Sequence, residues 1–384
     1  MRAILTAWSD KGRLIILSPE LERHELRRWR QTHSFYCPQC KGPVQLKVGE
    51  IVIPHFAHRK DTTCRASFSE GESPQHLKGK QLLYQFLVAG PQEVELEPLL
   101  DIISQRPDLL VKLGKTKVPI EFQCSTIPIS DLEQRTDGYR RAGMEPIWIL
   151  HTPAKLTNLS EGVGLFQFSK FQEWFIVSTP PEGDVLFTFN PHTKKFHYFS
   201  SLLHVAGQRY IGMHRILPLD FQIFPFARPK APTEEDVRQY GDLYETYRQK
   251  ELQNRILLNR RGIKDPFLRS CYEMKMLPTQ LPSWIGVPVP KSHSFREADV
   301  EWQFRFIHFL TRNNIPFSDV SPYSIDRFVN GFVGNSTDQS RACEHFIAFL
   351  NNCGIEYADQ KTLFRENVIL RLISERFLAN DGYN

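Results

Sequence analysis

The sequence predicts an α/β protein with a small N-terminal module, a mixed α/β core and a mostly α-helical C-terminal domain. Three observations support this prediction. Cys37, Cys40 and Cys64 lie close together near the N-terminus. Between residues 73 and 150 the apolar pattern indicates a helix, three strands, a second helix and a fourth strand. Beyond residue 233 the apolar positions recur at helical spacing.

The length and composition are those of a multidomain globular protein. The chain has 384 residues, of which 41% are hydrophobic and 24% are charged. We place the domain boundaries at 1–68, 69–155, 156–228 and 229–384, with the third range as an extension of the core. The net charge of +5 permits an anionic partner without requiring one.

The N-terminal stretch does not have the pattern of a signal peptide or a membrane span. Ser9, Asp10, Lys11 and Arg13 interrupt it before any long apolar run develops. We therefore expect a cytoplasmic protein with no membrane insertion.

The first 30 residues predict two short strands and a helix. Residues 3–7 and 13–17 are the expected strands, and residues 20–30 form a good helical run. Ser18 is the expected N-cap, and Pro19 suits the first helical position.

The cysteine and histidine residues predict a zinc-finger-like module. Cys37 and Cys40 have the spacing of one half of a structural zinc site. We expect His58 and Cys64 to complete the tetrahedron, with His55 as the reserve ligand. Thiolates favour Zn²⁺ over harder cations.

A redox pair and three unconnected cysteines are the alternatives to zinc. A redox pair normally lies between a strand and a helix, whereas "CPQCKGP" indicates a turn between strands. The chain has seven cysteines, and a disulfide framework is not expected. Cys124, Cys271, Cys343 and Cys353 are expected to be core residues.

The core is predicted in six elements. Ser73 and Pro74 open a helix that continues to Val88, and Ser130 caps a second helix, with Glu133 completing a capping box. The expected strands cover residues 93–98, 107–111, 118–123 and 146–150.

Two acids lie on the hairpin formed by the second and third of these strands. Gly114 and Lys115 can fill the centre of a type II′ turn, which pairs residues whose numbers add up to 229. Asp108 then lies opposite Glu121 on one face, with Cβ atoms about 5 Å apart. Alternation adds Gln123 to the same face.

Two carboxylates this close repel each other unless a cation lies between them. A hard divalent cation such as Mg²⁺ or Mn²⁺ suits oxygen ligands, and it can activate water and stabilise a phosphate. The alternative is a solvated face on which the acids pair with Lys112 or Lys117.

The order of these elements resembles the PD-(D/E)xK nuclease core. More closely, residues 1 to about 200 resemble the CoiA family of bacterial competence proteins, through "FYCPQC", "PHFAH", "ESPQHLKGK", "RPDLLV", "PIEFQCS", "QRTDGYRRAG" and "PIWIL". The resemblance implies a nuclease that acts with homologous recombination on incoming DNA during genetic transformation. By position, it makes Asp108 and Glu121 ligands of Mg²⁺ or Mn²⁺.

Gln123 stands where the wider nuclease superfamily usually has lysine. A lysine supplies positive charge, whereas glutamine only orients groups through hydrogen bonds. The implied activity is a metal-dependent endodeoxyribonuclease that hydrolyses phosphodiester bonds of branched or single-stranded DNA, borrowing Lys80 or Lys117. The alternative is a catalytically weak or inactive DNA-binding recombination accessory. A transcription factor is disfavoured, because no recognition helix follows the cysteines.

Further candidate residues lie on the two core helices. His76 and Lys80 are four residues apart, where they can contact phosphate or position the nucleophile, or else be solvated. Glu72 is a further candidate for the metal site. Arg135 and Tyr139 are candidates for substrate binding through phosphate and base stacking. The alternative for these two is a surface arginine and a half-buried tyrosine.

The remaining chain is predicted more coarsely. We expect a helix running into a strand over 165–177, a hairpin over 184–200, a linker over 225–236, and helices at 234–259, 296–314, 337–352 and 361–379. The basic residues between 248 and 275 suit either a DNA surface or a solvated helix, and we favour the solvated helix. DNA is the expected partner, a recombinase is a further candidate, and the sequence allows a homodimer as well as a monomer.

Overall fold

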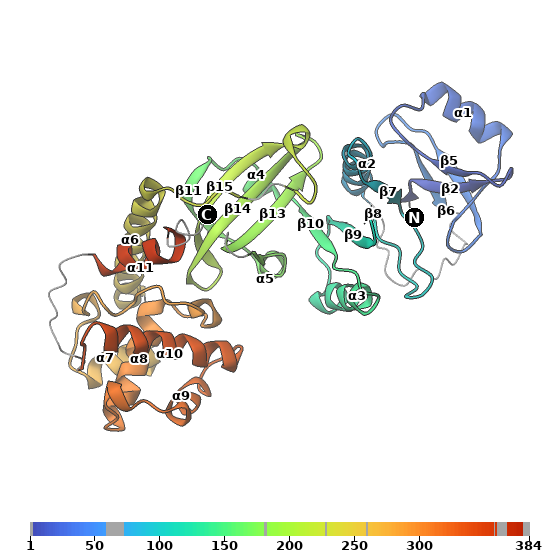
Figure 1. Cartoon of the computed structure of the whole chain (residues 1–384). Helices are drawn as coiled ribbons and strands as arrows, with labels where there is room; N and C mark the ends of the chain where they lie inside the picture. The colour runs from blue at the N-terminus through green and yellow to red at the C-terminus, as the bar shows by residue number, and fades with distance from the viewer. Residues whose placement is uncertain are drawn as a thin grey trace.

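The structure is a computed structural model that describes residues 3–58, 73–179, 183–226, 229–258, 260–356, 358 and 367–378. Its mixed α/β architecture confirms the predicted fold class at that level. Figure 1 shows the N-terminal module at one end and the helical region at the other, with a nine-stranded sheet between them.

The N-terminal module is a six-stranded antiparallel sheet with one helix. Its strands are β1 (Ala3–Ile4), β2 (Thr6–Ser9), β3 (Leu14–Ile16), β4 (Phe35–Tyr36), β5 (Pro43–Lys47) and β6 (His55–His58), in the order β1-β6-β5-β4-β2-β3. The helix α1 (Arg23–Thr32) begins after the residues we expected. Ser18 and Pro19 lie in the turn before it, because Leu17 still donates its N–H to Leu5 of the sheet. The predicted Ser18 cap is therefore wrong.

The two faces of this small sheet pack against different neighbours. Ile4 and Ala7 join Leu26 of α1 in one apolar cluster. Ala3 and Leu5 instead belong to the core of the central sheet, with Leu77 and Leu83 of α2. The module and the central sheet therefore share a continuous hydrophobic core.

The central sheet contains strands from both predicted core ranges. These are β7 (Glu93–Leu96), β8 (Leu109–Leu113), β9 (Thr116–Gln123), β10 (Ile147–His151), β11 (Gly162–Gln167), β12 (Val177–Thr179), β13 (Gly183–Asn190), β14 (Lys195–Ala206) and β15 (Arg209–Pro218). Along the sheet the order is β11-β15-β14-β13-β10-β9-β8-β7, and β12 pairs with β13. Only β10 pairs in parallel, with β9 and with β13, among the strands described. The sheet thus continues across residue 155.

The two core helices lie on opposite faces of this sheet. Helix α2 (Pro74–Val88) begins as predicted, with the Ser73 hydroxyl accepting from the N–H of His76. Helix α3 (Ile129–Arg141) begins one residue before the expected cap. Pro128 has an extended backbone and its carbonyl accepts from Asp131, so Ser130 already lies within the first turn. The predicted Ser130 capping box is therefore wrong.

The hairpin of β8 and β9 has the predicted register. Leu109 pairs with Ile120 and Leu113 with Thr116, and Gly114 adopts a φ of 59° at the turn. A positive φ is the conformation that a glycine adopts without strain. Leu109 and Ile120 pack toward α2, whereas Leu110 packs toward Tyr139 of α3.

The part of the core after β10 was predicted less well. The predicted hairpin over 184–200 is confirmed as β13 and β14, which turn at residues 191–194. The expected helix at the start of 165–177 is wrong, because Leu165 and Phe166 belong to β11 and pair with β15. Two short helices, α4 (Ala154–Thr157) and α5 (Lys170–Glu173), flank β11.

The C-terminal region is helical, as expected. Its helices are α6 (Glu234–Leu258), α7 (Pro266–Glu273), α8 (Asp299–Arg312), α9 (Pro322–Val329), α10 (Ser336–Asn352) and α11 (Val368–Leu378). Thr233 and Asp236 cap α6 reciprocally, which confirms its predicted start. The short helices α7 and α9 were not predicted. Residues 361–366 and 379 of the last expected helix lie outside the described residues.

The packing of α2 on β9 gives a testable prediction. Gly79 lies so close to the ring of Phe122 that a Cβ would overlap it. Alanine gains about 1 kcal/mol of helix propensity over glycine, but overpacking a core costs about 1–3 kcal/mol. We expect Gly79→Ala to lower the free energy of unfolding in urea. Gly49→Ala, where a Cβ would meet open space, is the control. An unchanged or higher stability for Gly79→Ala would contradict this close approach.

Candidate nuclease and metal sites

Asp108 lies immediately before β8, and its carboxylate accepts hydrogen bonds from two elements. Oδ2 is 2.9 Å from the backbone N of Phe122 and 3.0 Å from Nε2 of His76. Oδ1 is 3.6 Å from Nζ of Lys80. The side chain is 12% exposed, so this acid lies at the edge of the core with cationic partners from α2.

Lys80 is buried completely. Its side chain has no exposed area, and Nζ donates to Oε1 of Glu97 at 2.6 Å. His76 and Lys80 therefore both face the sheet and Asp108, as one of the two interpretations required. The solvated alternative is wrong for Lys80, because its side chain has no exposed area.

Glu121 is the second buried acid, and its partners come from α3. Arg135 Nη2 lies 2.5 Å from Glu121 Oε1, and the Tyr139 hydroxyl donates to the same oxygen. The Arg135 guanidinium also stacks over the ring of Trp148, with 5.3 Å between its central carbon and the ring centroid. These contacts hold the Glu121 carboxylate in one place.

The expectation that the two acid side chains share one face is therefore wrong, because their partners lie on opposite faces of the sheet. Their register is as predicted, but the Asp108 carboxylate bonds toward α2 and the Glu121 carboxylate toward α3. The reason is that β8 begins at Leu109, so Asp108 is not held to the alternation of the strand. The charges still interact, because Asp108 contributes to raising the pKa of Glu121.

The two acids have opposite pKa shifts. Burial opposes the charge of Asp108, but His76, Lys80 and the Phe122 N–H outweigh it and hold its pKa well below the ordinary value. Burial raises the pKa of Glu121 to about 6, with a further contribution from Asp108 and partial compensation by Arg135. One carboxylate is thus strongly ionised and its neighbour titrates near neutrality.

Tyr139 does not lie where a base could stack on it. The side chain is 0% exposed and its hydroxyl is committed to Glu121. The predicted direct contact between Tyr139 and substrate is therefore wrong, because α3 packs this ring into the core with Leu110 and Met144. Arg135 keeps 13% side-chain exposure beside the same carboxylate.

Gln123 is also turned inward. It is 7% exposed, and its Nε2 donates to the carbonyl of Ser125 at 2.7 Å. The amide therefore shapes the end of β9 locally. Glu72 lies outside the described residues.

The chemistry of Asp108 and Glu121 fits a hard divalent cation. Both acids offer buried carboxylate oxygens, Asp108 from the residue before β8 and Glu121 from β9. A bound cation would offset the repulsion from Asp108, which adds to burial in raising the pKa of Glu121. In the described part of the chain, no third acid, histidine or cysteine closes a cluster around them. Water or phosphate oxygens would supply the remaining ligands, as is usual for Mg²⁺.

Glu97 is the residue that sequence reasoning missed at this site. It follows β7, is 2% exposed and has a φ of 52°. Besides Lys80, its carboxylate accepts from the Leu5 N–H and the Thr6 hydroxyl. The sequence signal was weak: Glu97 continues the alternation of Glu93 and Glu95, which are surface residues that pair with Lys112.

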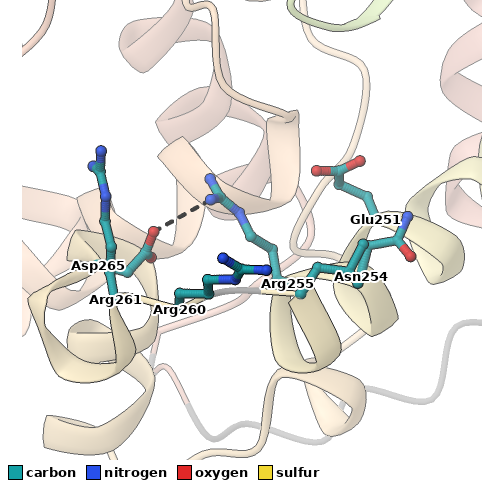
Figure 2. A pocket seen from close by; sticks show the side chains of 7 residues that line it. Glu251, Asn254, Arg255, Arg260, Arg261 and Asp265 are labelled. Carbon is teal, nitrogen blue, oxygen red and sulfur yellow. Dashed lines mark hydrogen bonds and ion pairs between the residues drawn. The ribbon is translucent and has the colours of Figure 1, made fainter.

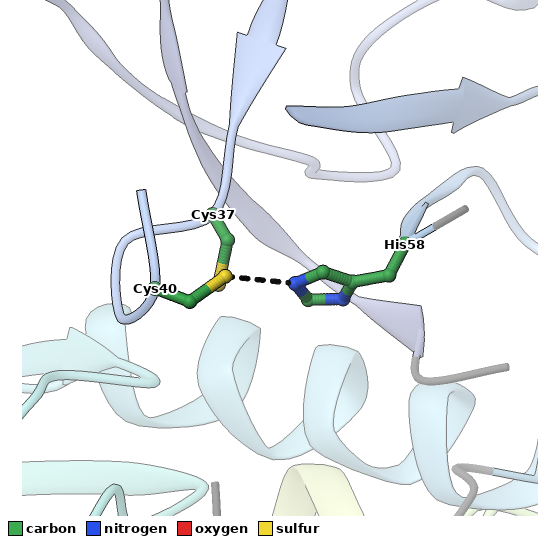
Figure 3. A group of neighbouring side chains, drawn as sticks. All are labelled: Cys37, Cys40 and His58. Atoms are coloured by element: carbon green, nitrogen blue, oxygen red, sulfur yellow. Dashed lines mark hydrogen bonds between the residues drawn. The ribbon is translucent and has the colours of Figure 1, made fainter. Parts of the chain in front are cut away.

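A second group of potential ligands lies in the N-terminal module. The ligand atoms of Cys37, Cys40 and His58 lie within 4.8 Å of one another. Figure 3 shows the three side chains pointing toward one another. Two soft sulfur donors and an imidazole suit Zn²⁺. His55 lies apart from the cluster and interacts with the carbonyl of Ile53, which favours His58 as the ligand. The expected fourth ligand, Cys64, lies outside the described residues.

The basic stretch of the helical region has two kinds of side chain. Arg255 pairs with Glu301 and Asp265, and Arg248 donates to backbone carbonyls. Arg260 and Arg261 border a cavity of about 460 Å³. Figure 2 shows the side chains that line it. The exposed bases of this stretch are Lys250, Arg260, Arg261, Lys264, Arg269 and Lys275. Exposure of these bases suits a solvated helix and a DNA surface equally, so the choice between them stays a prediction.

Comparisons with known proteins define the class of this chain. The model of the competence protein CoiA nuclease-like domain matches residues 72–226, and that of the CoiA N-terminal domain matches residues 19–67. The first match contains both acids and the whole strand series from β7 to β15. Together the two matches cover more than half of the chain, which belongs to the CoiA family of competence proteins.

A curated relative extends this likeness beyond the two domains. The competence protein CoiA of Bacillus subtilis (strain 168) is 27% identical over 366 residues, which span 89% of this chain and 91% of that protein. No solved structure matches the chain. Among the described residues, the longest helices are too polar or too short to cross a membrane.

The group of potential zinc ligands Cys37, Cys40 and His58, called the metal cluster below, gives the second prediction. We expect the purified protein to carry about one equivalent of Zn²⁺ by elemental analysis. Cys37→Ser and His58→Ala should lose most of it, because each removes a ligand of the cluster. His55→Ala should retain it, since its ring bonds to the backbone instead. Equal zinc loss in the His55 and His58 variants would contradict this choice of ligand.

Proposed function

We propose that this protein is a Mg²⁺- or Mn²⁺-dependent deoxyribonuclease that acts on incoming DNA during genetic transformation. The observation that carries this proposal is the pair of buried acids Asp108, just before β8, and Glu121, on β9, in a nuclease-like domain. A buried pair of like charges is costly unless positive charge compensates it, and the carboxylates suit a metal while the neighbouring cationic side chains suit a phosphate. The likeness to competence proteins supports the biological setting.

In this proposal Asp108 and Glu121 hold the metal. When bound, the metal would lower the pKa of a water molecule and stabilise charge on the phosphate. The chain's own groups prepare the site. His76 and the Phe122 N–H fix the orientation of Asp108, and Arg135 and Tyr139 fix that of Glu121.

In related nucleases a lysine at the position of Gln123 usually supplies positive charge. In this proposal Lys80 supplies that charge instead. Its ammonium lies 3.6 Å from Asp108, while Gln123 is bonded to Ser125. Such a fixed charge in a desolvated place interacts more strongly with a phosphate than the same charge in water. Arg135, which retains 13% side-chain exposure, is the direct phosphate contact, whereas the buried Lys80 acts through its charge.

A DNA-binding recombination accessory is the second candidate function. The inward-turned Gln123 favours it, because glutamine brings no charge to the position where a nuclease usually has lysine. In that case the acids and Lys80 would stabilise the fold, and the protein would bind DNA without cutting it.

The experiment is cleavage of labelled single-stranded, duplex and branched DNA with Mg²⁺, Mn²⁺ or EDTA. We expect metal-dependent cutting, and a loss of at least about 100-fold in Asp108→Asn and Glu121→Gln, because both remove a charged metal ligand without changing shape. The DNA form that is cut fastest identifies the substrate.

Asp101→Asn and Glu93→Gln are the matched controls, because both acids are exposed and lie near the hairpin. They should cut like the wild type. Tight DNA binding without cutting in every sample would support the accessory function instead. Cutting that survives in both Asp108→Asn and Glu121→Gln would remove the acids from the active site.

A further inference from the structure

Glu97 connects two parts of the molecule that are far apart in the sequence. Both oxygens of its carboxylate accept from the Leu5 N–H, at 3.2 and 3.1 Å, and Oε2 accepts from the Thr6 hydroxyl at 2.9 Å. Oε1 also accepts from Lys80 Nζ at 2.6 Å. The Glu97 backbone N–H donates to the carbonyl of Asp108 at 3.0 Å. One buried residue therefore touches the N-terminal sheet, α2 and the start of β8.

The segment of Leu5 and Thr6, which hydrogen-bonds to Glu97, is connected to the Cys37–Cys40–His58 metal cluster through two strand pairs. Leu5 lies between β1 and β2. Strand β1 pairs with β6, which ends at His58. Strand β2 pairs with β4, which ends one residue before Cys37. The ligands of the cluster are thus joined by backbone hydrogen bonds to the strands on both sides of the Glu97 contact.

Lys80 depends on this contact for its position. A buried ammonium costs several kcal/mol unless charged partners and hydrogen bonds compensate it. Glu97 is its nearest acid, at 2.6 Å against 3.6 Å for Asp108. The positive φ of Glu97 is a strained conformation for a residue with a side chain, and such strain is kept where the surrounding structure requires it.

We propose that Glu97 is a positioning residue that couples the N-terminal metal cluster to the nuclease site, by holding the Lys80 ammonium beside Asp108 only when the β1–β2 segment is ordered. The inference rests on the proposed function for its catalytic consequence. Its structural part, the dependence of Lys80 on Glu97 and on the cluster, stands independently of cleavage. The N-terminal module then acts as part of the nuclease site.

The first test measures cleavage. In Glu97→Gln we expect kcat to fall at least about tenfold with little change in KM, because a supporting residue is lost and DNA contacts are not. Glu97→Asp should recover part of the rate. Glu95→Gln is the matched control, as Glu95 lies on β7 two residues before Glu97 and pairs with Lys112 at the surface. Equal losses in the Glu95 and Glu97 variants would overturn the proposal.

The second test does not use cleavage. Amine acetylation read by mass spectrometry should leave Lys80 unmodified in the folded wild type, because its side chain has no exposed area, while the exposed Lys115 is modified. We expect Lys80 to become reactive at least about tenfold faster in Glu97→Gln and in the Cys37→Ser/Cys40→Ser double variant. Thr6→Val, which removes one hydrogen bond, should show a smaller increase and serves if Glu97→Gln does not fold.

The outcomes separate the two proposals. A wild type that cuts no DNA but shows the expected labelling would refute the nuclease function and keep the coupling. Cleavage with Lys80 protected equally in all variants would refute the coupling and keep the nuclease. Increased labelling in the Glu97 variant but not in the cysteine variant would overturn the link to the metal cluster.

Discussion

The arrangement of this molecule depends on the buried ion pairs that the Lys80 ammonium makes with Glu97 and Asp108. An ion in the protein interior is tolerated only when its partners are held in place, and here the partners come from different elements. Glu97 follows β7 and accepts a hydrogen bond from Thr6 of the N-terminal sheet. Asp108 precedes β8 and accepts a hydrogen bond from Phe122 of β9. The N-terminal module, α2 and the hairpin must therefore assemble together, which agrees with the apolar core that Ala3 and Leu5 share with α2.

The two acids of the hairpin differ because their surroundings differ. Asp108 is surrounded by cationic and N–H donors, so its pKa is low. Glu121 is more deeply buried and lies near a second negative charge, and its pKa is raised to about 6 despite Arg135. Pairs of titratable groups whose environments separate their pKa values are typical of active sites. Together with the match to a nuclease-like domain, this asymmetry is the physical basis of the proposed metal site.

Local sequence rules predicted the hairpin well. The single glycine at residue 114 fixed the register of the two strands, from Leu109 opposite Ile120 to Leu113 opposite Thr116. The rules failed where a distant partner decides the outcome. Glu97 resembled its surface neighbours because its role depends on Leu5 and Thr6, about 90 residues away. Tyr139 resembled a substrate contact because it lies one helical turn after Arg135. That spacing does not reveal that α3 buries the ring in the core. The helix expected from residue 165 is instead the end of β11, because apolar residues there suit both structures and the pairing with β15 decides between them.

Calorimetric titration of Mn²⁺ into the zinc-loaded protein at neutral pH would show directly whether the two acids bind a divalent metal. We expect one saturable site in the wild type, and a fall in affinity of at least about tenfold in Asp108→Asn and in Glu121→Gln. Binding that is unchanged in both variants, or a wild type that binds DNA but no Mn²⁺, would contradict the claim that these two acids are arranged to hold a divalent metal.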